Sequence, residues 1–206
     1  MKRLFLQIIV SKSKKYYYRR WRSYFMKATG IVRRIDDLGR VVVPKEIRRT
    51  LRIREGDPLE IFTDREGEII LKKYSPIGEM GAFAKQYAES LAQTSGHIAC
   101  IADRDQFIAV AGGAKGLLGK EVSKRFEELI DERETKLATS EDRSFVPLTE
   151  EKVEDFTQEA ICPIICEGDA IGAVVLLSKE NKGKMGEVEQ KLIMSAAGFL
   201  GRQMEQ

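Results

Sequence analysis

The chain has 206 residues, 43% hydrophobic and 33% charged, a composition typical of ordered globular proteins that excludes disordered and fibrous classes. Its net charge of +3 hides an asymmetry: residues 1–25 hold eight basic and no acidic residues, 26–75 twelve and nine, and 76–206 fifteen and 23. A polyanionic partner is therefore expected to meet the N-terminal part.

Residues 1–25 are basic and aromatic and contain no signal-peptide cleavage pattern. We interpret them as a non-native upstream extension, because a tightly patterned segment begins at Met26. A basic arm that follows DNA phosphates and a helix lying on a membrane surface are the alternatives.

Residues 26–75 contain short alternating elements. The pattern predicts strands over 28–35 and 41–43 around a turn at 36–39, and Pro44 at the first position of a helix over 45–51. A hairpin with strands over 59–63 and 68–74 follows. So small a β-rich module leaves strand edges unpaired and an apolar face uncovered, which favours obligate dimerisation.

Residues 76–206 are expected to form one α+β sandwich with an antiparallel sheet. Helices are predicted over 79–94 and 186–204, with hairpins over 98–111 and 160–178 and a strand near 145–148 in a loop over 136–158. A further helix is predicted from the apolar spacing of Leu118, Val122, Phe126, Leu129 and Ile130. The apolar stripes of 79–94 and 186–204 are interpreted as core, although packing between subunits would join two dimers into a tetramer.

Arginine supplies most of the positive charge of residues 26–75. Arg33 and Arg34 end the first predicted strand, Arg40 begins the second, Arg48 and Arg49 lie on the helix, and Arg52 and Arg54 follow. The guanidinium fork binds two phosphate oxygens or the edge of guanine at once, so we predict a site for double-stranded DNA at Arg33, Arg34, Arg40, Arg48 and Arg49. The alternative is a solvated face in which nearby acids pair with these arginines.

The sequence MKATGIVRRIDDLGRVVVPKEIRRTL over 26–51 resembles the AbrB-type transition-state regulators. That resemblance implies a swapped-hairpin dimer that binds DNA through Arg33, Arg40, Arg48 and Arg49; at Arg34 the family often has lysine. It also implies recognition through DNA shape and flexibility rather than a fixed base code.

The segment 160–178, with Cys162-Pro163-Ile164 and Ile171-Gly172-Ala173-Val174, resembles the closing hairpin of GAF domains. The whole chain resembles a sporulation regulator of the AbrB group in which an AbrB-like domain precedes a GAF-type domain. The implied function is activation or repression of late, forespore-type genes. A GAF-like domain is expected either to bind a small effector, of unidentified chemistry, or to serve as an oligomerisation scaffold.

Other chemistry is less well supported by the residues. His97, Cys100, Cys162 and Cys166 carry zinc-binding atoms, but positions 162 and 166 of one strand lie roughly 13 Å apart, too far for a shared ion unless the chain folds back. One histidine and no nucleophile motif indicate no enzyme, and the glycines at 112–116 lack the spacing of a phosphate loop. We expect no metal and no other cofactor.

The expected organisation is therefore an extension over 1–25, a DNA-binding and dimerisation domain over 26–75, and a GAF-like domain over 76–206. Three cysteines and the lack of any apolar run of about 20 residues favour a cytoplasmic protein without a membrane partner. The predicted DNA binding would associate it with the nucleoid. Two other functions stay open: a small-molecule sensor whose basic module only dimerises, and an antitoxin-type autoregulator.

Overall fold

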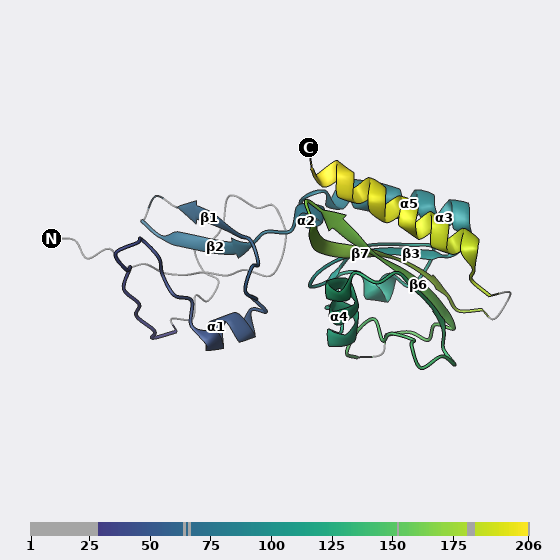
Figure 1. The fold of residues 1–206 in the computed structure, drawn as a ribbon, viewed down its shortest axis with the longest axis horizontal. Helices are drawn as coiled ribbons and strands as arrows, with labels where there is room; N and C mark the ends of the chain where they lie inside the picture. Colours follow the sequence, from purple (N-terminus) through teal and green to yellow (C-terminus); the bar gives the residue numbers. More distant parts are fainter. Residues whose placement is uncertain (1–28, 64, 66, 152, 181–183, 206) are drawn as a thin grey trace. The chain divides into compact units, whose positions relative to one another are not determined.

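The computed structural model describes residues 29–63, 65, 67–151, 153–180 and 184–205. The chain forms two compact units, one running to Tyr74 and the other over Ser75–Gln206 (Figure 1). The predicted extension over 1–25 and the start of the first predicted strand lie outside the described residues.

The first unit contains the helix α1 (Lys45–Thr50) and the strands β1 (Leu59–Thr63) and β2 (Ile69–Lys73). β1 and β2 pair antiparallel, with Leu59 opposite Lys73 and Thr63 opposite Ile69, so the predicted hairpin is confirmed. The helix also forms where predicted, except that Pro44 precedes its first residue and its carbonyl accepts the Arg48 amide at 3.0 Å.

The strands predicted over 28–35 and 41–43 do not form: residues 29–35 and 41–43 have no regular secondary structure. The turn between them does form, with Gly39 at φ 77°. A strand needs a hydrogen-bonding partner, and the side chains of Val32 and Val42 are 86% and 69% exposed in this single chain. The prediction failed because β-branched alternation indicates a tendency to pair and cannot supply the partner.

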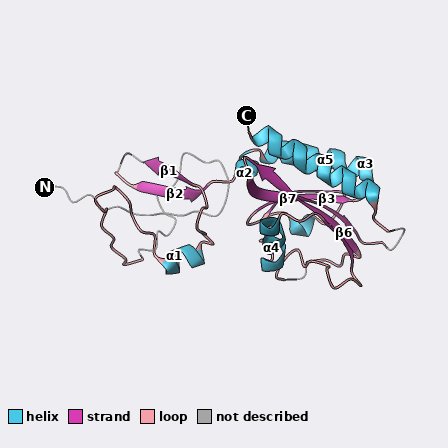
Figure 2. Ribbon diagram, viewed as in Figure 1, coloured by secondary structure: helices cyan, strands magenta, loops and turns pink. Residues whose placement is uncertain are grey.

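The second unit is a five-stranded antiparallel sheet in the order β4-β3-β7-β6-β5. The strands are β3 (Ile98–Asp103), β4 (Phe107–Ala111), β5 (Lys136–Thr139), β6 (Gln158–Cys166) and β7 (Asp169–Ser178). Both predicted hairpins are confirmed by the pairings β3–β4 and β6–β7. The central strands β3, β6 and β7 are largely buried, because helices cover both faces of the sheet (Figure 2).

The two faces carry separate cores. On one face α3 (Gly81–Ser95) and α5 (Glu187–Met204) pack against alternate residues of the strands, among them Ile101, Ile164 and Val174. The other face is covered by α4 (Lys124–Glu132), whose Phe126 packs against Phe107 of β4 with the ring centroids 5.6 Å apart. Figure 1 shows α3 and α5 together on one side of the sheet and α4 on the other.

The helix predicted over 79–94 forms as α3, and a short helix that was not predicted, α2 (Pro76–Glu79), precedes it with Met80 between them. Two other predicted elements of this unit need correction. The helix predicted from Leu118 begins only at Lys124, after Ser123 caps it by accepting the Phe126 amide, and Leu118 is exposed. No strand forms at 145–148, where Val146 and Leu148 enter the α4-side core as irregular chain, and β5 lies at 136–139 instead.

Two glycines allow backbones to approach closely. A Cβ built on Gly172 of β7 would lie 2.1 Å from the Ala102 carbonyl oxygen of β3. A Cβ on Gly201 of α5 would lie 2.1 Å from the Ile165 oxygen of β6. Any larger residue at Gly201 would therefore force α5 away from the sheet.

Candidate nucleic-acid interface

The five predicted arginines all lie at the surface of the first unit. Arg33 and Arg34 precede the turn, Arg40 ends it, and all three are exposed. Arg48 and Arg49 lie in the last turn of α1, the first half-buried and the second exposed. The structure thus places the arginines on two local elements, a turn and a helix end.

Asp36 organises the turn that carries Arg40. Its Oδ1 accepts the amides of Leu38 (3.1 Å) and Arg40 (2.7 Å), and its Oδ2 accepts the Arg40 Nε at 2.8 Å. The backbone amide of Arg40, and then its guanidinium, lower the pKa of the Asp36 carboxyl. Asp36 therefore remains ionised and fixes the guanidinium of Arg40, whose side chain is still 69% exposed.

The chain after α1 is fixed by contacts that the sequence did not indicate. Lys73 of β2 donates to the Arg52 carbonyl at 2.9 Å and pairs with Asp57 Oδ2 at 3.2 Å. The same Asp57 oxygen accepts the Arg54 amide at 2.8 Å. A lysine at the end of a strand looks like an ordinary surface residue in the sequence, and its role appears only when β2 lies beside residues 52–57.

The hydrophobic side chains of the first unit are poorly covered in the single chain. Apart from Pro44, Ile53 is the only apolar residue buried among those described before residue 75. Several large apolar side chains are exposed instead: Ile31, Val32, Ile35, Leu38, Val42 and Ile61. Most of them lie in the same segments as Arg33, Arg34 and Arg40.

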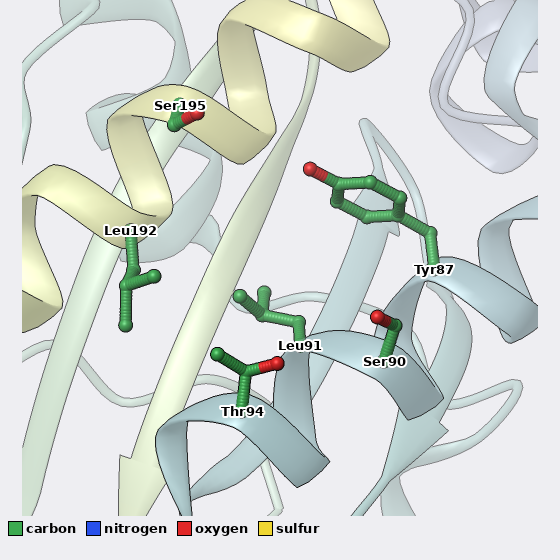
Figure 3. A pocket seen from close by; sticks show the side chains of 6 residues that line it. All are labelled: Tyr87, Ser90, Leu91, Thr94, Leu192 and Ser195. Atoms are coloured by element: carbon green, nitrogen blue, oxygen red, sulfur yellow. The ribbon is translucent and has the colours of Figure 1, made fainter.

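The second unit carries an open pocket of about 170 Å³ between α3 and α5 (Figure 3). Its lining is partly apolar and partly hydroxyl-bearing: Tyr87, Ser90, Leu91, Thr94, Leu192 and Ser195. Sites for drug-sized ligands are commonly about 300–1,000 Å³, so this pocket is small for one. Beside it Tyr87 stacks on Phe199 at 5.4 Å, and Phe199 is 38% exposed.

The residues considered for zinc do not converge. Cys100 lies in the core on the α4 side of the sheet and Cys162 in the core on the opposite side. Burial raises the pKa of both thiols, which keeps them protonated. Within the described part of the chain, no three histidine, cysteine or acidic side chains gather as metal ligands would.

Glu159 of β6 is a buried acid that sequence reasoning missed. It pairs across the sheet with Leu177, so both side chains point into the α4-side core, and it is 0% exposed. Its Oε1 accepts the Val146 amide at 2.7 Å, whereas Oε2 is buried without a hydrogen-bond partner among the described residues. Burial raises the pKa of this carboxyl to about 8, against smaller lowering effects of the Val146 amide and Lys136.

Comparison with known proteins gives the family. A model described as the C-terminal region of stage V sporulation protein T, a transcription factor, matches residues 79–205. Stage V sporulation protein T of Bacillus subtilis (strain 168) is 58% identical over 182 residues, which cover 88% of this chain and 100% of that protein. The chain belongs to the stage V sporulation protein T family. No helix in the described residues has the length and apolar content needed to cross a bilayer.

The two units match different groups of proteins. Transition state regulatory protein AbrB of Bacillus subtilis (strain 168) is 67% identical over 52 residues, 25% of this chain and 53% of that protein. A model described as the MazE bacterial antitoxin matches residues 32–79. The GAF domain of an Acinetobacter phosphoenolpyruvate-protein phosphotransferase has a TM-score of 0.50 at 14% identity, over 64% of this chain and 83% of that one. The predicted fold, an AbrB-like domain followed by a GAF fold, is confirmed.

Proposed function

We propose that this protein is a DNA-binding regulator of transcription, acting on late, forespore-type sporulation genes and without enzymatic activity. The observation that carries the proposal is the set of surface arginines before the Asp36–Arg40 turn, at its end and on α1, in a segment 67% identical to AbrB. A guanidinium group held in place at a surface, as Asp36 holds that of Arg40, binds phosphate oxygens with little loss of conformational entropy. DNA binding also assigns the protein to the cytoplasm, at the nucleoid.

Dimerisation follows from the exposed apolar residues of the first unit. Residues 29–35 and 41–43 form no strand and carry exposed β-branched side chains, and a second copy of the same segment would give them strand partners and cover these side chains. A swapped pairing of residues 29–43 between protomers would place two sets of the five arginines on one surface. Such a dimer matches the two-fold symmetry of duplex operators.

Duplex binding by the full-length protein tests the proposal. Arg33→Ala and Arg48→Ala are expected to weaken binding on the order of tenfold per lost phosphate contact at 0.1 M salt. The slope of log K against log salt should fall by about 1 per contact, hence about 2 for a dimer. The control is Arg125→Ala on α4, an exposed arginine of the second unit, which should bind like wild type.

The oligomeric state, measured by sedimentation, should be the same in all these variants. Wild-type affinity in both Arg33→Ala and Arg48→Ala would show that the basic surface is not the DNA site. The sensor alternative, in which the first unit only dimerises, also predicts that neither substitution lowers the affinity for DNA.

The second unit is proposed to control or assemble the DNA-binding units, either by binding a small effector or as a tetramerisation scaffold. The exposed ring of Phe199 on α5, stacked on the half-buried Tyr87 of α3, supports assembly of two dimers through these helices. An antitoxin function is less well supported, because the antitoxin model covers only residues 32–79 and the rest of the chain is a folded domain with two cores.

A further inference from the structure

Arg52 has a backbone conformation that normally selects glycine. Its φ is 51°, in the left-handed region, where a Cβ clashes with the neighbouring carbonyl oxygen. It follows α1 in a Schellman motif: the Ile53 amide donates to the Arg48 carbonyl at 2.8 Å and the Arg52 amide to the Arg49 carbonyl at 3.3 Å. In this motif the left-handed position is usually glycine, and sometimes asparagine.

The strain at Arg52 is imposed by its surroundings. The hydrogen bonds donated by the Arg52 and Ile53 amides close the end of α1, and Lys73 of β2 donates a hydrogen bond to the Arg52 carbonyl. Asp57 in turn forms an ion pair with Lys73 and accepts a hydrogen bond from the Arg54 amide. A left-handed residue persists only where neighbouring contacts fix it in this way, and glycine would satisfy the same contacts without strain.

The backbone at position 52 therefore favours glycine over the arginine that the chain has there. Arg52 is half-buried and lies within a segment, 45–54, that holds five further charged residues, four of them basic and only Glu46 acidic. Arg48 and Arg49 belong to the same helix end, whose carbonyls bond the Arg52 and Ile53 amides. The side chain of Arg52 is thus carried by the same rigid element as two arginines of the proposed DNA surface.

We propose that Arg52 is a further DNA-binding residue that contacts the phosphate backbone of the duplex, and that this contact accounts for the strained arginine. The inference rests on the proposed DNA-binding function. A phosphate contact of this kind adds affinity for every duplex and steepens the salt dependence, without changing the preference among sequences. The competing explanation is structural: a cation at the C-terminus of α1 would stabilise the negative end of the helix.

Three full-length variants separate these explanations: Arg52→Gly, Arg52→Lys and, as a reference for the DNA surface, Arg48→Ala. Binding to two unrelated duplexes is measured between 50 and 200 mM salt, and unfolding by calorimetry. Hydrogen exchange of residues 45–57 assigns any stability change to the first unit. Arg52→Gly should lose affinity for both duplexes on the order of tenfold per contact at 0.1 M salt, with a shallower salt slope.

The same Arg52→Gly variant should unfold at a midpoint equal to or above that of wild type, because glycine relieves the strain. Arg52→Lys keeps the charge and should retain most of the wild-type affinity and salt slope. Unchanged DNA affinity of Arg52→Gly overturns the inference, and so does a loss of affinity accompanied by a lower midpoint and faster exchange. If Arg48→Ala loses affinity and Arg52→Gly does not, the proposed contact of Arg52 is wrong and the rest of the arginine surface stands. If both variants bind like wild type, the arginine surface itself is not the DNA site.

Discussion

Glu159→Gln is expected to remove most of the pH dependence that this buried acid gives to the second unit. In the folded protein the carboxyl is 0% exposed and burial raises its pKa from 4.5 to about 8. Between these pH values the folded state keeps the proton that the unfolded state has released. The free energy of unfolding therefore falls as pH rises, by about 1.4 kcal/mol per pH unit.

The size of the effect follows from the two pKa values. From pH 4.5 to pH 8 the loss of stability is about 5 kcal/mol, of which about 3 kcal/mol has occurred by pH 7. The side-chain oxygen of glutamine still accepts the Val146 amide. Its NH2 group, however, takes the place of the unpartnered Oε2, and burying this donor without an acceptor has a constant cost of about 1–3 kcal/mol. Wild type should thus be the more stable protein at low pH and Glu159→Gln at high pH, with the curves crossing between about pH 5 and pH 7.

Urea unfolding followed by circular dichroism at several values between pH 5 and pH 8 measures this difference. Titratable groups that both proteins share cancel when the two free energies are subtracted. Glu132→Gln, which changes an exposed acid on α4, is the matched control for the loss of one carboxyl group from the second unit. A difference for Glu159→Gln that does not vary with pH would refute the argument, because it would mean that Glu159 is ionised in the folded state.

Two further predictions concern α5. Gly201→Ala should destabilise the second unit by about 1–3 kcal/mol in urea unfolding, because the added Cβ meets the Ile165 carbonyl. Gly198→Ala, at an exposed position of the same helix, is the control and should stabilise the unit by about 1 kcal/mol. Equal effects would contradict the close approach of α5 to β6. Phe199→Glu should convert tetramers into dimers in sedimentation, with Gln190→Glu on the same helix as the control. Tetramers that survive Phe199→Glu would show that assembly does not use this face.

Local sequence patterns predicted the elements whose partners are close in the chain. β1 with β2, β3 with β4, and β6 with β7 are hairpins, each joined by a short turn that the sequence marks with glycine or aspartate. The length of α5 was predicted for a similar reason, since a continuous apolar stripe and the absence of proline are local properties. The turn before Arg40 was predicted from acidic side chains that bond the adjacent backbone amides.

The failures involve information that the local sequence does not hold. Alternation around Val32 and Val42 predicted strands that a single chain leaves unpaired. Nothing in the sequence marks Arg52 as left-handed, because the contacts that fix it come from Lys73 and Asp57. Glu159 was missed because β6 is covered on both faces, so the alternation that normally identifies a solvent-facing acid does not apply.

Assembly and DNA binding are coupled in the first unit if residues 29–43 pair as proposed. Val32 lies next to Arg33 and Val42 lies two residues from Arg40, so the apolar side chains that need a partner alternate with the arginines that would contact DNA. A change at Val32 or Val42 should therefore weaken DNA binding by weakening the dimer, an effect that high protein concentration reverses. A change at Arg33 or Arg40 removes a phosphate contact, and no protein concentration that saturates dimerisation restores it. The concentration dependence of binding thus separates assembly residues from DNA-contacting residues within one fifteen-residue segment.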